Sequence, residues 1–195
     1  MRPGEYLSYP RFMALLAESL VEEWLNRNRF FTIRGLKHGV GEIDLLGIRL
    51  EADGSVTGRH VEVQASFRPI GYISKLTDTI AKESGKGRAS AVARTSTQMA
   101  ECAREWVDSK FRAPQKVKIR EQMWPDANWS YHLVHAVVRE DEEIRLFETE
   151  GVQCHSFDLL LRELSQRQDQ AFCGSAGGDL AEIVGYFSAN MNSSE

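Results

Sequence analysis

The chain has 195 residues, of which 42% are hydrophobic and 27% charged, and its net charge is −4. This composition excludes a disordered, collagen-like or coiled-coil chain and a strongly basic, histone-like protein. It does not exclude a DNA-processing enzyme, because clustered carboxylates in an active site carry negative charge that metal ions then neutralise. The length predicts one domain that is large enough to fold without a disulfide or a structural metal.

Cysteine usage and the lack of long apolar runs predict a cytoplasmic protein. Cys102, Cys154 and Cys173 are an odd number of cysteines at unpaired spacings, which suits reduced thiols better than a disulfide framework. The first residues lack the apolar core and the small-residue cleavage site of a secretory signal. No run of about 18 apolar residues is present, so we expect no membrane-spanning segment.

Hydrophobic periodicity predicts a helix, a three-stranded meander and then alternating helices and strands. Leu16, Leu20 and Trp24 recur at helical spacing, and Pro10 precedes them at a place that a helix tolerates. The predicted strand at 42–51 is apolar on both faces, which is typical of the centre of a sheet. The predicted helices are 11–28, 98–111, 141–149, 157–167 and 180–187, and the predicted strands are 30–36, 42–51, 59–67, 132–138 and 152–155.

Two stretches are expected to lack long regular elements. Residues 68–97 are rich in Ser, Thr, Gly and Lys, which predicts a mobile loop with one short helix. The stretch around Pro114 and Pro125 is predicted to be a polar connection. The element order indicates an α/β fold, a three-layer sandwich around a mixed sheet of about five strands. We expect a single domain with a core at 11–139, a C-terminal α/β extension at 140–188 and a flexible tail at 189–195.

Asp44 is the informative residue of the predicted central strand. A carboxylate there is costly unless it is paired or bound to a metal. A hairpin turn at 52–55 makes paired residue numbers sum to about 106–108, which places Asp44 opposite Glu62 or Gln64 on the same face. Two like charges so placed would repel, and a divalent cation with oxygen ligands, Mg²⁺ or Mn²⁺, would relieve the repulsion.

Two segments of the chain resemble a known family: Gly41-Glu42-Ile43-Asp44-Leu45-Leu46-Gly47, followed by His60-Val61-Glu62-Val63-Gln64-Ala65-Ser66. Together they resemble the PD-(D/E)XK nuclease superfamily, chiefly its restriction-endonuclease-like and Holliday-junction-resolvase-like branches. The resemblance covers residues 18–111, roughly half of the chain, and implies an αβββαβ core. It also implies that Asp44 is the motif aspartate, Glu62 the glutamate of the E-x-K element and Glu18 the helix glutamate. By the same resemblance these residues, with Val63, bind one or two Mg²⁺ or Mn²⁺ ions, which activate a water for attack on a phosphodiester.

The residues themselves leave the helix ligand open, because Glu18 and Glu22 share one face of the first helix. Gln64 departs from the family pattern, which has lysine at this position. A lysine would offset charge in the transition state, whereas glutamine can hydrogen-bond the attacking water but brings no charge. Some members of the superfamily carry glutamine here and are active, and others lose activity or take a lysine from the following helix. Lys75 and Lys82 are the candidates for such a lysine, and Asp44, Glu62 and Gln64 are the predicted catalytic residues.

Two groups of basic residues could neutralise phosphates, with a solvated surface as the alternative for each. The predicted nucleic-acid-binding residues are those of the first group, Lys75, Lys82, Lys86 and Arg88. The second group runs from Lys110 to Arg120 without an acidic residue. Trp124 and Trp129 could form a stacking platform for bases, with loop packing as the alternative.

The sequence therefore predicts a cytoplasmic, Mg²⁺- or Mn²⁺-dependent nuclease whose partner is DNA, and it is compatible with a homodimer or with a place in a larger complex. Two other functions stay open. Gln64 favours a nucleic-acid-binding module of the same fold with a degenerate site, which a cleavage assay would reveal. The acidic pI of about 5.8 favours a protein-interaction subunit of a larger complex, which would lack affinity for nucleic acid.

Overall fold

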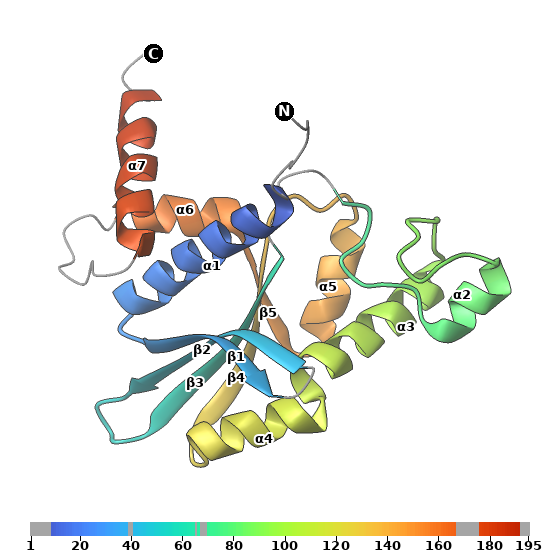
Figure 1. Cartoon of the computed structure of the whole chain (residues 1–195), viewed down its shortest axis with the longest axis horizontal. Helices are drawn as coiled ribbons and strands as arrows, with labels where there is room; N and C mark the ends of the chain where they lie inside the picture. Colours follow the sequence, from blue (N-terminus) through green and yellow to red (C-terminus); the bar gives the residue numbers. More distant parts are fainter. Residues whose placement is uncertain (1–8, 39–40, 65, 67–69, 167–175, 192–195) are drawn as a thin grey trace, which may run out of the picture.

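The computed structural model describes residues 9–38, 41–64, 66, 70–166 and 176–191. In this part of the chain a five-stranded sheet forms the middle layer, and helices cover both of its faces (Figure 1). The strands are β1 (Phe31–His38), β2 (Gly41–Leu50), β3 (Val56–Gln64), β4 (Asn128–His135) and β5 (Val152–Ser156). The helices are α1 (Tyr9–Arg27), α2 (Asp78–Ser84), α3 (Ser96–Val107), α4 (Pro114–Met123), α5 (Asp141–Thr149), α6 (Phe157–Gln166) and α7 (Ala176–Met191), with a π-helical turn, η1 (Asp108–Arg112), between α3 and α4.

The sheet is mixed, and its strands lie in chain order. β1, β2 and β3 form an antiparallel meander, whereas β3, β4 and β5 run parallel and need helical crossovers. Leu45 pairs with Val61 and Leu50 with Val56, which confirms the predicted hairpin register. Gly54 closes the hairpin with a φ of 85°, in the left-handed region that glycine adopts without strain. The predicted α/β three-layer architecture is confirmed.

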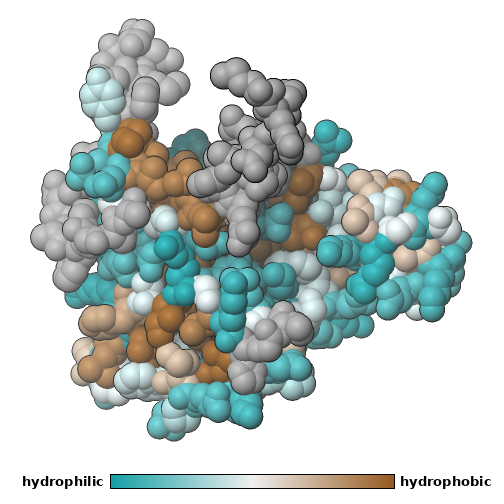
Figure 2. Space-filling model, viewed as in Figure 1, coloured by the Kyte–Doolittle hydropathy of each residue, from teal (hydrophilic) through white to brown (hydrophobic). Residues whose placement is uncertain are grey.

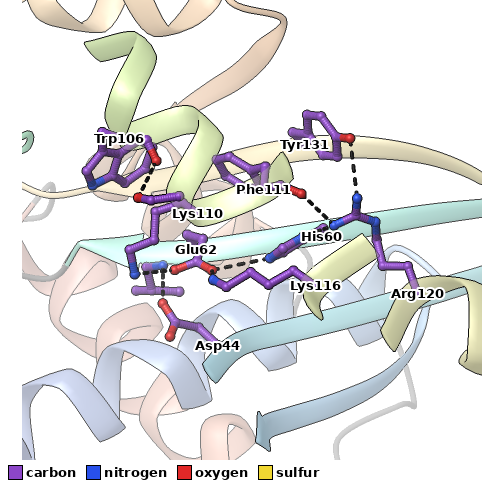
Figure 3. A network of polar contacts seen from close by, with 11 residues as sticks. Asp44, His60, Glu62, Trp106, Lys110, Phe111, Lys116, Arg120 and Tyr131 are labelled. Atoms are coloured by element: carbon purple, nitrogen blue, oxygen red, sulfur yellow. Dashed lines mark hydrogen bonds and ion pairs between the residues drawn. The ribbon is translucent and has the colours of Figure 1, made fainter. Parts of the chain in front are cut away.

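Alternating residues of the central strands pack into a separate core on each face. On one face, Leu25 of α1 and Leu160 of α6 belong to the same buried cluster as Val61 of β3. On the other face, Val107 and Phe111, at the end of α3 and in η1, pack with apolar residues of β4, α5 and β5. Because side chains alternate along a strand, His60 and Glu62 point away from the α1 face and toward η1 and α4 (Figure 3).

The predicted polar connection around Pro114 is wrong, because Pro114–Met123 forms the helix α4. Pro114 lies in the first turn, where its missing N–H costs nothing. The inner face of α4 carries Lys116 and Arg120 beside Ile119, and all three side chains are buried. Hydrophobic periodicity is the signal for a helix in a sequence, and a helix that buries charged residues does not produce it.

Residues 73–81, before α3, are largely buried, so the expectation of a mobile loop is wrong for this stretch, whereas residues 82–89 are all exposed. The predicted short helix, α2, is confirmed, and Leu76 and Ile80 form a buried cluster with Cys102 of α3. The buried carboxylate of Glu143 in α5 accepts the backbone N–H groups of Ile73 at 2.7 Å and Ser74 at 3.0 Å. These contacts join residues far apart in sequence, which local composition does not reveal.

The C-terminal helix is longer than predicted. α7 extends from Ala176 to Met191, so the first part of the predicted tail at 189–195 is helical, and 192–195 lie outside the described residues.

Figure 2 shows exposed hydrophobic residues over α1 and β1, where Leu16 and Phe31 are exposed. Within the described ranges, no helix combines the length and the apolar character needed to cross a membrane.

Candidate active site

The last residue pair between β2 and β3 at this end of the ladder is Leu45 with Val61, so Asp44, which precedes Leu45 in the chain, lies just beyond it. Beyond that pair, Oδ2 of Asp44 accepts the backbone N–H of Val63 at 2.8 Å (Figure 3). The carbonyl of Gln64 accepts the N–H of Ala136, just beyond the end of β4, and therefore points toward β4. Successive residues of a strand turn their backbone N–H and carbonyl groups to opposite sides, so those of Val63 point toward β2. The carboxylate of Asp44 and the carbonyl of Val63 therefore face the same gap at the end of the ladder. Continuing the observed register by one residue places Asp44 opposite Glu62, which is one of its two predicted positions.

Little positive charge lies near Asp44 to compensate the negative charge of its carboxylate. Burial raises the pKa of its carboxyl, and repulsion from Glu62 raises it further. The Val63 N–H and the charge of Lys110 oppose these effects, but the pKa still reaches about 7. An aspartate with such a pKa is half protonated at neutral pH, which marks a place where a cation would stabilise the folded protein.

Glu62, in contrast, is surrounded by donors. Its Oε2 accepts a hydrogen bond from Nζ of Lys110 in η1 at 2.6 Å, and its Oε1 accepts one from Nζ of Lys116 in α4 at 2.6 Å (Figure 3). Burial acts to raise the pKa of Glu62, but His60 and the two lysines outweigh burial and lower it to about 2. Glu62 is therefore ionised throughout the physiological pH range.

A buried chain of hydrogen bonds fixes Glu62 from the side of α4. Burial lowers the pKa of His60 to about 4, so its imidazole is neutral. Arg120 can only donate, and its Nη1 lies 2.8 Å from Nδ1 of His60. The proton of His60 is therefore on Nε2, which donates to Oε1 of Glu62 at 3.2 Å. Arg120 also donates to the Phe111 carbonyl at 2.9 Å, which ties the chain to η1.

The first helix brings Glu18, rather than Glu22, toward the two carboxylates. Burial raises the pKa of Glu18, and the charges of Glu42 and Glu62 act in the same direction, while Arg34 lowers it. Glu22 instead forms an ion pair with Arg34 at 3.5 Å. The arrangement of these residues favours Glu18 as the third acidic group, as the resemblance implies.

The cation near Glu62 does not come from Lys75 or Lys82. Lys110 and Lys116 occupy that position, and Lys75 instead lines a neighbouring hollow of about 660 Å³ together with Gln64, Arg88 and Lys110. Lys82 and Lys86 are exposed and lie outside this hollow. The signal that could have identified Lys110 and Lys116 was the basic run from Lys110 to Arg120, whose lack of acidic residues suggests that its partners come from elsewhere in the chain.

The oxygen atoms at this place fit Mg²⁺. The carboxylates of Asp44 and Glu62 and the carbonyl of Val63 are the hard ligands that this ion prefers. No group of three or more His, Cys, Asp or Glu side chains in the described part of the chain is arranged to hold a metal. Mg²⁺ is usually held by one or two protein carboxylates, with waters and substrate phosphates as the remaining ligands, so a pair of carboxylates suffices.

Asp44→Asn is expected to change how stability depends on pH in the metal-free protein. In the folded state the pKa of Asp44 rises from 3.8 to about 7, so between these values the folded state binds more protons than the unfolded state. The free energy of unfolding should therefore fall as pH rises through this window, by up to about 1.4 kcal/mol per pH unit for this group. The asparagine variant lacks this contribution and should be more stable than the parent above about pH 7.

Urea denaturation in EDTA from about pH 6 upward measures this difference, because the Glu62 carboxyl is almost fully ionised in both states by that pH. Parallel pH profiles for the parent and for Asp44→Asn would show that Asp44 is satisfied by protein hydrogen bonds and carries no stored repulsion.

Comparison with known proteins assigns no family to this chain. No family model matches the chain, and no curated protein matches it. Among solved structures, the chain is similar to the crystal structure of a protein of unknown function, AF1548, with 11% sequence identity and a TM-score of 0.43. The matched region covers 77% of this chain and 66% of that protein.

Proposed function

We propose that this chain is a metal-dependent nuclease that hydrolyses phosphodiester bonds in DNA. The observation that carries the proposal is the half-buried Asp44, with a pKa of about 7, beside the ionised Glu62 at the end of the β2–β3 ladder. A fold gains no stability from two carboxylates brought together in this way, whereas a site that binds a divalent cation requires them. The resemblance of residues 41–66 to a nuclease superfamily supports the same two residues.

Asp44, Glu62 and the Val63 carbonyl would hold Mg²⁺ or Mn²⁺, with Glu18 as a further acidic group. The ion would polarise the phosphate and lower the pKa of a bound water. Lys110 is 38% exposed and lines the hollow, so its ammonium group can reach a phosphate and offset charge in the transition state. Gln64 lines the same hollow and would hydrogen-bond the attacking water.

The remaining charged residues would position Glu62. The side chain of Lys116 is only 6% exposed and does not line the hollow, so its charge serves Glu62 alone. His60 donates a hydrogen bond to the carboxylate of Glu62, and Arg120 in turn donates one to His60. Fixing a metal ligand through hydrogen-bonded partners is typical of metal sites in proteins.

A cleavage assay tests this function. The purified protein is incubated with supercoiled plasmid and with fluorescently labelled oligonucleotides in Mg²⁺, Mn²⁺ or EDTA. We expect cleavage in either metal and none in EDTA. The variant Asp44→Asn, purified in the same way, controls for contaminating nucleases. Equal cleavage by Asp44→Asn and the parent would disprove the assignment.

A second function, a DNA-binding module without catalysis, is favoured by the two lysines on Glu62. Both oxygens of this carboxylate already accept ammonium donors at 2.6 Å, so its charge is compensated without a metal. Such a module would bind DNA in EDTA, and Mg²⁺ would change neither the binding nor the DNA. The cleavage assay with all of its substrates separates the two functions.

We also propose a cytoplasmic location. Cys102 and Cys154 are free thiols, and both are at least partly buried. Burial raises the pKa of the Cys154 thiol to about 12, which keeps it protonated and unreactive. Buried, unpaired thiols are typical of proteins in reducing compartments.

A further inference from the structure

Several residues that line the hollow beside Glu62 have no role in the proposed hydrolysis. It extends from Gln64 and Lys110, at the candidate active site, past Ile73, Lys75, Trp106 and Ser109. A surface that only receives phosphate groups needs cations and hydrogen-bond donors. This hollow also has an apolar wall, formed by Ile73 and the indole of Trp106, and a wall of this kind requires an apolar or aromatic ligand group.

Two phenylalanine rings pack against the indole of Trp106 and fix its position. Its ring centroid lies 4.7 Å from that of Phe147 and 5.8 Å from that of Phe111, and the second contact is edge-to-face at 73°. Trp106 is nevertheless only partly buried and lines the hollow. A ring that is fixed on one side and accessible on the other can receive a nucleobase without loss of its own conformational freedom.

Lys75 provides a cation that the protein does not use. Its side chain is exposed and has no ion pair or hydrogen bond among the described residues. Its backbone is fixed, because Ser74 is bound to Glu143 and the next residue, Leu76, is buried. Arg88, in contrast, already pairs with Asp78 and with Glu105.

We propose that this hollow binds one unpaired nucleotide of the substrate strand, with its base against Trp106 and its phosphate on Lys75. The inference rests on the proposed function and specifies its substrate as single-stranded nucleic acid, or a single-stranded segment next to the scissile bond. Bases in a continuous duplex stack on one another and present only their edges, so they cannot cover an apolar wall inside a hollow. An unstacked base exposes its face, which stacks on aromatic side chains. The volume of about 660 Å³ is large enough for one nucleotide.

Equilibrium binding in EDTA tests the inference without requiring cleavage. Fluorescein-labelled oligothymidylate and its blunt duplex with oligoadenylate are titrated with the protein at one salt concentration, and anisotropy is measured. We expect the parent to bind the single strand at least tenfold more tightly than the duplex. Lys75→Ala should reduce that preference to less than about threefold, because one charge-assisted contact to phosphate is lost.

Lys82→Ala is the matched control, since it removes the same charge from an exposed lysine outside the hollow. It should weaken binding of the single strand and the duplex alike and leave their ratio unchanged. Equal affinity of the parent for both forms, tighter binding of the duplex, or the same effect of both lysine variants on the ratio would overturn the inference.

Tryptophan fluorescence identifies the base contact. Trp106→Phe retains an aromatic ring against Phe111 and Phe147, so we expect it to fold. Oligothymidylate should quench the fluorescence of the parent, and this quenching should be lost in Trp106→Phe. Quenching that persists in the variant would place the base on another tryptophan, such as Trp124, and would overturn the assignment to the hollow.

These results are independent of those for catalysis. Preference for the single strand that depends on Lys75, without metal-dependent cleavage of any substrate, would retain the nucleotide site and reject the nuclease. Metal-dependent cleavage that is lost in Asp44→Asn, without preference for the single strand, would retain the nuclease and reject the nucleotide site.

Discussion

Glu62→Gln is expected to lower the rate of metal-dependent DNA cleavage on the order of 10³-fold, because the neutral amide is a poor ligand for a divalent ion. The same substitution should lower the free energy of unfolding by about 3–5 kcal/mol, since it leaves Lys116 buried without its counter-charge. Alanine at this position would have the same defect, so it cannot be expected to leave the fold intact. Single-turnover cleavage and urea denaturation measure the two effects.

A second substitution separates loss of chemistry from loss of stability. Glu62→Gln/Lys116→Met removes the unpaired buried charge along with its partner and should recover most of the lost stability, because an apolar side chain of similar length replaces the lysine. The double variant should remain as inactive as the single variant. Recovery of cleavage together with stability would mean that Glu62 serves the fold and not the reaction.

Lys110→Ala is expected to reduce cleavage by about 10²–10³-fold with little change in stability. The physical reason is that Lys110 contacts Glu62 at 2.6 Å and is the more exposed of the two lysines on that carboxylate, so it takes the role of the lysine that Gln64 replaces. Gln64→Lys in the Lys110→Ala background should restore part of the activity, because position 64 lines the same hollow.

Lys116→Ala is the matched control for this prediction. Its side chain is buried, so the variant should lose stability by about 3–5 kcal/mol. Rates of the purified, folded variants are compared under conditions where each is stable. If Lys110→Ala cleaves DNA as fast as the parent, another group must offset the charge of the transition state. If Lys110→Ala is inactive and Gln64→Lys restores no activity to it, a lysine at position 64 cannot replace the lysine at position 110.

Local patterns were sufficient to predict the meander and the register of its hairpin. Asp53-Gly54 allows a tight turn, and strands of matched length on either side leave one pairing that keeps Leu45 and Val61 on the same buried face. The position of Asp44 beside Glu62 follows from that register. The sequence therefore predicted the two acidic residues that the structure brings together.

The cations around Glu62 could not be predicted in the same way. α4 shows no amphipathic pattern, since its inward face carries Lys116 and Arg120, and their partners, Glu62 and His60, lie more than fifty residues earlier in the chain. Pairings of this kind follow from tertiary packing, and neither periodicity nor composition encodes them. The hollow is likewise formed by segments distant in sequence, because Glu143 of α5 fixes the backbone that presents Lys75.

Thermal denaturation of four samples, the parent and Asp44→Asn each with EDTA or with Mn²⁺, tests most directly whether Asp44 and Glu62 share a metal. A ligand that binds only the folded state stabilises it by mass action, by about 2.7 kcal/mol at a concentration one hundred times the dissociation constant. We predict that Mn²⁺ raises the midpoint of the parent but not that of Asp44→Asn, and that the variant in EDTA melts at or above the parent in EDTA. Equal responses of the two proteins to Mn²⁺, or no response from either, would contradict a metal site at Asp44.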